Sequence, residues 1–161
     1  MASSIKQKSG FTLIEIMLVL VIIGITLTVA IPSLFPSDEQ LTRQESERVL
    51  TLLQVARDEA AFGGRVIAAH IDTDKLEFFE RDANNRELWN PSNALELRPR
   101  AFANGVHAQL TIAGNAITAK EAQITFMPVG VSLPFELSLA SPTTAMTIVG
   151  DAIGNLRFKA K

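Results

Sequence analysis

The chain has 161 residues, of which 47% are hydrophobic and 20% are charged, and its formal net charge is -2. This length is enough for one domain with its own core and a short appendage. The slightly acidic balance argues against nucleic-acid binding, which needs a basic surface, and one tryptophan with no tyrosine offers few platforms for stacking on bases. No cysteine is present, so the compartment must be inferred from topology.

The N-terminus combines a short basic segment with a long apolar run. Residues 1–10 are polar and basic, and we interpret them as a leader peptide that is removed by processing. The run at 11–31 has 21 residues and, as a helix, would be about 31 Å long, which matches the apolar core of a bilayer. Lys6 and Lys8 precede the run and Asp38 follows it, so the positive-inside rule places the N-terminus in the cytoplasm. The bulk of the chain then lies on the far side of the membrane.

Glu15 is the only charged residue in the apolar run. A carboxylate in a spanning helix costs about 2.5 to 3.5 kcal/mol on insertion scales, so it usually has a function and a partner. A cut between Gly10 and Phe11 would create an amine four residues from Glu15, beside a helix N-terminus. In packed chains, Glu15 of one chain could neutralise the Phe11 amine of its neighbour and fix the axial register. The alternative is a plain signal anchor whose glutamate reaches the membrane interface.

Residues 32–64 predict a second, amphipathic part of this helical stem. Pro32 and Pro36 each disfavour a regular helix, so we expect a kink or break near Pro32. Ser37 then offers an N-cap with Gln40 three residues later, which is a capping box, and two glycines supply the stop signal. The apolar residues recur at helical spacing and are Leu41, Val49, Leu52, Leu53, Ala56 and Ala60.

Residues 65–161 change to the alternating pattern of β-strands, which predicts a β-sheet domain. The eight expected strands are 65–71, 75–80, 106–112, 116–120, 123–127, 135–139, 146–149 and 156–159. Residues 82–100 are polar, contain two prolines and predict a long loop in which Trp89 is a buried anchor. The fold class is therefore α+β, with a long N-terminal helix whose first half is transmembrane and whose second half packs on an antiparallel β-sandwich.

The sequence contains no convincing catalytic, metal or cofactor site, so we expect a protein that is not an enzyme. His70 and His107 have no cysteine or carboxylate at metal-ligand spacing and are interpreted as structural or surface histidines. Asp72 and Asp74 imitate half of a calcium loop, but the glycine and the later glutamate of that pattern are missing. A solvated hairpin turn is the favoured interpretation of these two aspartates.

Residues 10–24, GFTLIEIMLVLVIIG, resemble the class III signal of type IV pilins and type II secretion pseudopilins. The resemblance implies that a prepilin peptidase, which is also a methyltransferase, cuts after Gly10 and methylates Phe11. It also implies that Glu15 is the glutamate that this family uses in filament assembly. A pilin-like fold is expected, with residues 11–31 as the membrane anchor and filament-core helix.

Several later segments are similar to minor pseudopilin H of type II secretion systems. They are residues 45–60, ESERVLTLLQVARDEA, with residues 124–130, ITFMPVG, residues 133–137, LPFEL, and residues 148–154, IVGDAIG. The resemblance implies a subunit that joins the tip complex of other minor pseudopilins to the shaft of major pseudopilin, for the export of folded proteins across the outer membrane. The location would be the inner membrane, in a single pass with a periplasmic C-terminal domain, and the periplasmic pseudopilus after assembly.

Two rivals come from other functional classes. FimT-like minor pilins of type IV pili share the C-terminal motifs and can bind DNA, but without Lys6 and Lys8 the chain has 13 basic and 17 acidic residues. The second rival is an exported enzyme or carrier behind an ordinary signal peptide that is cut after Ala30. Glu15 within the run and the missing catalytic cluster argue against this second rival.

Overall fold

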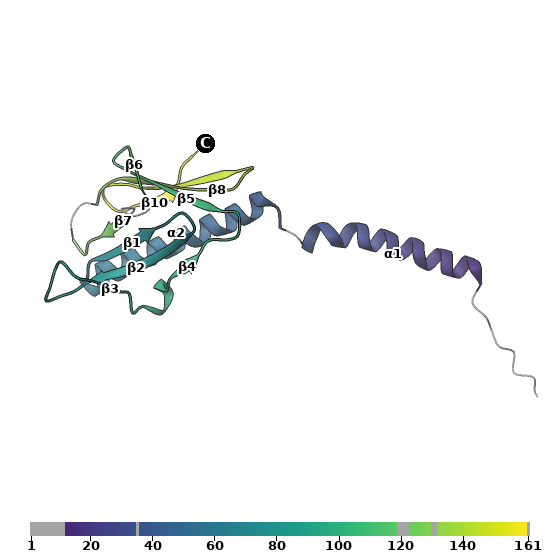
Figure 1. Ribbon diagram of the computed structural model, residues 1–161, viewed down its shortest axis with the longest axis horizontal. Helices are drawn as coiled ribbons and strands as arrows, with labels where there is room; N and C mark the ends of the chain where they lie inside the picture. Colours follow the sequence, from purple (N-terminus) through teal and green to yellow (C-terminus); the bar gives the residue numbers. More distant parts are fainter. Residues whose placement is uncertain (1–11, 35, 119–122, 130–131, 161) are drawn as a thin grey trace, which may run out of the picture. The chain divides into compact units, whose positions relative to one another are not determined.

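The computed structural model of the chain describes residues 12–34, 36–118, 123–129 and 132–160. The chain divides into two compact units, which are drawn in Figure 1. The first unit ends at Pro36 and holds helix α1 (Leu13–Leu34). The second unit begins at Ser37 and holds a second helix and all the described β-strands. Pro32 lies within the bounds of α1, and the next helix begins at Asp38.

Helix α2 (Asp38–Gly63) begins and ends at the signals in its sequence. The side-chain oxygen of Ser37 accepts a hydrogen bond from the backbone N–H of Gln40, and the Gln40 side chain accepts one from the backbone N–H of Ser37. The predicted capping box is therefore confirmed. Gly64 ends the helix with φ of 63°, a left-handed conformation that glycine adopts without a Cβ clash, and its N–H donates to the carbonyl of Ala60.

Two antiparallel sheets make up the rest of the second unit. The first has the order β3-β2-β1-β7, with β4 also paired to β2, and the second has the order β10-β9-β8-β5-β6. The strands of the first sheet are β1 (Ile67–Ile71), β2 (Lys75–Arg81), β3 (Trp89–Pro91), β4 (Arg100–Ala101) and β7 (Gln123–Phe126). Those of the second are β5 (His107–Ile112), β6 (Asn115–Ile117), β8 (Phe135–Ala140), β9 (Ala145–Gly150) and β10 (Leu156–Phe158). The eight predicted strands are confirmed within a few residues at their ends, except that residues 119 and 120 of the predicted strand 116–120 lie outside the described part of the chain.

The prediction of a long loop over 82–100 was wrong in part, and Trp89, which was expected to be a buried anchor, is only half-buried. This segment contains β3, the start of β4 and a turn of 3-10 helix, η1 (Leu95–Leu97), between them. β3 and β4 lie in a polar segment with two prolines and are too short to stand out from it, so sequence periodicity does not find them. Pro91 fits because β3 is the edge strand of its sheet, where a missing N–H costs little.

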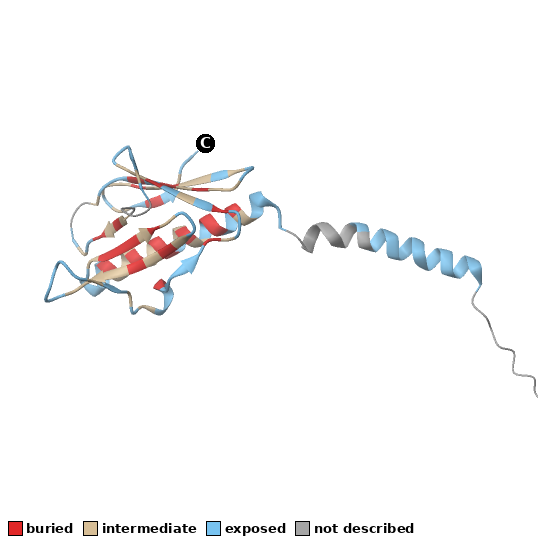
Figure 2. Cartoon of the chain, in the orientation of Figure 1, coloured by how far each residue is buried: buried red, intermediate tan, exposed pale blue. Residues whose placement is uncertain are grey.

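The hydrophobic core lies between α2 and the two sheets. Helix α2 contacts β1 and β7 of the first sheet and β8, β9 and β10 of the second. The buried stripe along α2 is visible in red in Figure 2. On this stripe Val49, Leu53, Ala56 and Ala60 are fully buried, as predicted, whereas Leu41 is only half-buried. Each large apolar side chain in such a core contributes about 1.5 to 3 kcal/mol by its burial.

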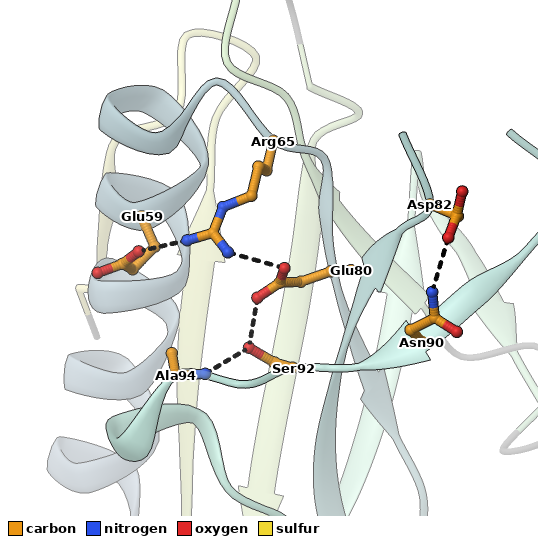
Figure 3. A network of polar contacts seen from close by, with 7 residues as sticks. All are labelled: Glu59, Arg65, Glu80, Asp82, Asn90, Ser92 and Ala94. Carbon is orange, nitrogen blue, oxygen red and sulfur yellow. Dashed lines mark hydrogen bonds and ion pairs between the residues drawn. The ribbon is translucent and has the colours of Figure 1, made fainter. Parts of the chain in front are cut away.

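A polar network ties the end of α2 to the first sheet (Figure 3). The Arg65 guanidinium donates to the carboxylates of Glu59, at 3.0 Å, and Glu80, at 2.8 Å. The Ser92 hydroxyl donates to the other oxygen of Glu80 at 2.9 Å and accepts from the backbone N–H of Ala94. These contacts fix the chain immediately after β3 against β2.

A second group of contacts fixes the chain immediately before β3. The Asp82 carboxylate accepts hydrogen bonds from the backbone N–H groups of Asn84 and Asn85, and these hold the pKa of Asp82 below its usual range. Its second oxygen accepts from the Asn90 side chain at 3.1 Å (Figure 3). The edge strand is thus held by side-chain contacts at Asn90 and, just past its end, at Ser92, as well as by its ladder to β2.

Candidate functional site

The first turn of α1 holds the one charged residue of that helix. The backbone N–H of Glu15 donates to the carbonyl of Thr12, at 3.1 Å, and to the Thr12 hydroxyl oxygen, at 3.3 Å. Thr12 therefore acts as a side-chain cap, and Glu15 is the third residue of the helix. The positive end of the helix dipole favours a carboxylate at this position. Glu15 is exposed, so its charge is available to a group outside the described chain.

The described side chains of α1 form an uncovered apolar surface. Leu13 and Ile14 are 79% and 75% exposed, and Leu20 and Ile25 are each 62% exposed. Soluble proteins rarely expose a continuous apolar surface of this kind unless it binds a partner or a membrane. The surface of α1 is therefore the candidate functional site, with Glu15 as its one charge.

Two threonines of α1 satisfy their hydroxyl groups within the helix itself. The Thr26 hydroxyl donates to the carbonyl of Ile22 at 2.8 Å, and the Thr28 hydroxyl donates to the carbonyl of Gly24 at 2.7 Å. Bonds of this type allow a hydroxyl to face an apolar environment. This role was not predicted from the sequence, although the spacing of each threonine to the carbonyl four residues earlier is the signal for it.

Among the residues that the structure describes, no helix is both long enough and apolar enough to cross a membrane.

The predicted processing residues lie outside the described part of the chain. Gly10 and Phe11, for which we predict cleavage and methylation, are among residues 1–11. The kink expected at Pro32 also stays a prediction, since the described chain shows only that α1 continues to Leu34 and that α2 follows from Asp38.

The other candidate residues do not come together into a site. His70 lies on β1 with its ring edge-on to Phe79, and His107 lies exposed at the start of β5. Asp72 and Asp74 lie at the turn between β1 and β2, where Asp72 accepts from the backbone N–H of Thr73. Within the described ranges, no group of three or more histidine, aspartate or glutamate side chains is arranged to hold a metal ion.

A buried polar cluster on α2 was missed because the helical pattern counts only apolar residues. Thr42, Glu45 and Ser46 are buried together with the apolar stripe. The Glu45 carboxylate pairs with Arg48, whose guanidinium also donates to the carbonyl of Ala101 on β4 at 3.0 Å. The spacing of three between Glu45 and Arg48 was the available signal for this pair. The cluster attaches β4 to the helix.

Comparisons with known proteins agree with this architecture. Residues 5–31 match the prokaryotic N-terminal methylation motif. Type II secretion system protein H of Aeromonas hydrophila is 25% identical to the chain, over 94% of this chain and 93% of that protein.

Solved structures show the same fold. The minor pseudopilin EpsH from the type II secretion system of Vibrio cholerae aligns with a TM-score of 0.62 at 17% identity, over 76% of this chain and 97% of that one. The type IV minor pilin FimU of Pseudomonas aeruginosa aligns with a TM-score of 0.53 at 17% identity, over 74% of this chain and 88% of that one. The model of the family "Type II transport protein GspH" matches residues 45–154, which is more than half of the chain. The chain therefore belongs to the GspH family of type II transport proteins.

Proposed function

We propose that this GspH-family pseudopilin is a non-enzymatic assembly subunit that joins the tip complex of other minor pseudopilins to the shaft of major pseudopilin. The observation that carries the proposal is helix α1, whose described side chains are uncovered and are apolar apart from the Glu15 carboxylate and the hydroxyl groups of Thr26 and Thr28. A helix of this kind needs an apolar environment, which a membrane supplies before assembly and neighbouring stems supply afterwards.

Processing precedes assembly in this account. The prepilin peptidase removes residues 1–10 by cutting between Gly10 and Phe11, and it methylates the new N-terminus at Phe11. The match of residues 5–31 to the methylation motif supports this step. The cut removes Lys6 and Lys8 and leaves a positively charged amine close to Glu15 in the sequence.

Before incorporation, residues 11–31 anchor the protein in the inner membrane with its N-terminus in the cytoplasm. The unit Ser37–Lys161 then lies in the periplasm, since Asp38 and Glu39 are the first charges after the apolar run. The same apolar surface moves from lipid to the core of the filament, and both environments are apolar. The apolar surface of the helix is therefore shielded from water both before and after this transfer.

Glu15 determines the register of the filament in this proposal. Its carboxylate is exposed on α1 and has no basic side chain within the helix to pair with. In the apolar filament core, the Phe11 amine of a neighbouring chain neutralises this carboxylate. An unpaired charge in that core would be costly, so only the axial position that pairs the two groups is stable.

The place of the chain in the filament is tested by co-purification. A tagged full-length chain is isolated from detergent-solubilised membranes, and the pseudopilins that remain bound to it are identified. We expect the tip pseudopilins to remain bound in a strain that lacks the major pseudopilin, because the tip contact does not depend on the shaft. The major pseudopilin should co-purify only from the complete strain. Capture of the major pseudopilin alone, or of no pseudopilin from either strain, would contradict a junction between tip and shaft.

A further inference from the structure

The first sheet carries a small open cavity on the face that points away from the core. Its volume is about 290 Å³, near the lower end of the range for small-molecule sites. A cavity of this size accommodates one ring rather than a chain of several residues. It is lined by Ala68, His70, Glu77, Phe79, Trp89 and Gln123, which come from strands β1, β2, β3 and β7.

The cavity exists because a small residue lies between larger neighbours. Ala68 pairs directly with Phe79 on β2 and with Thr125 on β7, so these side chains share one face of the sheet. Ala68 is only 1% exposed, whereas Phe79 is half-buried. The methyl group of Ala68 therefore forms a floor with taller side chains around it.

The aromatic walls are held in place by their neighbours. The Arg81 guanidinium lies 4.8 Å from the centre of the Trp89 ring, and the His70 ring meets Phe79 edge-on with ring centres 6.4 Å apart. Strand β3, which carries Trp89, is fixed by the side-chain contacts of Asn90 and Ser92 shown in Figure 3. The walls are thus largely formed before any ligand arrives.

Three polar side chains lie in one row across the sheet beside these walls. His70 on β1 is directly opposite Glu77 on β2 and Gln123 on β7. The Glu77 carboxylate and the Gln123 amide oxygen accept hydrogen bonds, and the Gln123 amide also donates them. An aromatic wall with polar groups along one side suits a ring that has an apolar face and hydroxyl groups at its edge.

The charges around the cavity disfavour a cationic ligand. Lys75 lies 3.0 Å from the Glu77 carboxylate and neutralises it, and Arg81 already occupies a cation–π position on Trp89. A proline or phenylalanine side chain would fit the walls but would leave the polar row without hydrogen-bond donors. The ligand that uses both parts of the site is neutral and carries several hydroxyl groups on a ring.

We propose that this cavity binds one neutral sugar ring, which stacks against Trp89 and Phe79 and places its hydroxyl groups at Glu77 and Gln123. The proposal concerns the second unit alone and does not depend on the place of the chain in a filament. The ring is either a free monosaccharide or one residue of a longer glycan, because both present the same face and the same hydroxyl groups to a site of this size.

Trp89 is the only tryptophan of the chain, so its fluorescence reports directly on the cavity. The full chain, in a detergent without a sugar headgroup, is titrated with glucose, galactose and N-acetylglucosamine and with trisaccharides of each. We expect a saturable change in emission with a dissociation constant of about 1 mM for at least one ring. Equal affinity for a monosaccharide and its trisaccharide identifies a site for a single ring, whereas tighter binding of the trisaccharide identifies a glycan.

Matched variants separate the cavity from general effects of added sugar. Glu77→Ala and Gln123→Ala should each weaken binding about tenfold, because each removes a hydrogen-bonding group from the row. Gln109→Ala, which changes an exposed glutamine on β5 of the other sheet, should leave it unchanged. Sorbitol, a linear polyol, should give no saturable change.

Three results would overturn the proposal. The first is a change in Trp89 emission that does not saturate with any of the sugars up to about 10 mM, a concentration well above the expected dissociation constant. The second is saturable binding that Glu77→Ala and Gln123→Ala leave unaltered. The third is a saturable change with sorbitol equal to that with the sugars, which would show that the response does not need a ring.

Discussion

Replacing Glu15 by valine is expected to leave the protein in the membrane but to reduce its incorporation into the filament at least tenfold. Insertion should not suffer, because the substitution removes a charge that costs about 2.5 to 3.5 kcal/mol at the centre of a spanning helix. Incorporation should suffer because the Phe11 amine of the neighbouring chain is left without its partner. Breaking a buried charge pair typically costs about 3 to 5 kcal/mol, which is more than a tenfold effect.

Three quantities are measured for each variant. They are the amount of the protein in the membrane fraction, the amount of the other pseudopilins that co-purify with it, and the amount of secreted protein. Glu15→Gln is the informative companion, since it keeps the size and polarity of the side chain and removes only the charge. Met17→Leu, a change between apolar residues on the exposed surface of the same helix, is the matched control and should behave as the unmodified chain. Normal secretion and unchanged co-purification by Glu15→Val would contradict the role of this carboxylate in register.

Gly150→Ala is expected to destabilise the second unit by about 1 to 3 kcal/mol through overpacking. Gly150 on β9 pairs directly with Phe135 on β8, and a Cβ at this position would lie 2.2 Å from the Phe135 ring. Phe135 is 5% exposed and belongs to the core, so the added methyl group forces the ring to shift against its packed neighbours. The steric cost exceeds the gain of about 0.5 to 1 kcal/mol that alanine normally brings over glycine in a strand.

Thermal unfolding of the full chain tests this prediction, with Gly63→Ala as the matched control. Gly63 is the last residue of α2, and a Cβ there would lie 2.9 Å from Nε of Arg65, so this side chain must shift slightly within its ion pairs to Glu59 and Glu80. This second substitution should be close to neutral, because the helix preference of alanine offsets the cost of that shift. Combining Gly150→Ala with Phe135→Leu should cost less than the two separate changes together. A neutral Gly150→Ala, or strict additivity with Phe135→Leu, would show that the ring has room to move.

Local signals in the sequence predicted most of the fold. The ends of α2 follow from Ser37, Gln40 and Gly64, whose effects act within a few residues along the chain. The eight predicted strands follow from their alternating pattern, which reflects one buried and one outward face. The prediction failed for β3 and β4, because they lie in a polar segment and form only through pairing with β2, which depends on tertiary structure.

The two candidate sites also differ in whether the sequence alone reveals them. The apolar run and Glu15 are contiguous in the sequence, so the order of the residues alone reveals both of them. The cavity on the first sheet combines residues as distant as Ala68 and Gln123, and only the strand order brings them together. The contact between Phe135 and Gly150 likewise depends on register, which a single sequence does not reveal.

Processing and assembly of the chain as a pseudopilin are tested by the mass of its mature N-terminal peptide. The protein is isolated from membranes of cells that contain the prepilin peptidase. We expect residues 1–10 to be absent and Phe11 to carry one methyl group on its amine. An N-terminus that still includes residues 1–10, or one at Ile31 after an ordinary signal-peptide cut, would contradict the account.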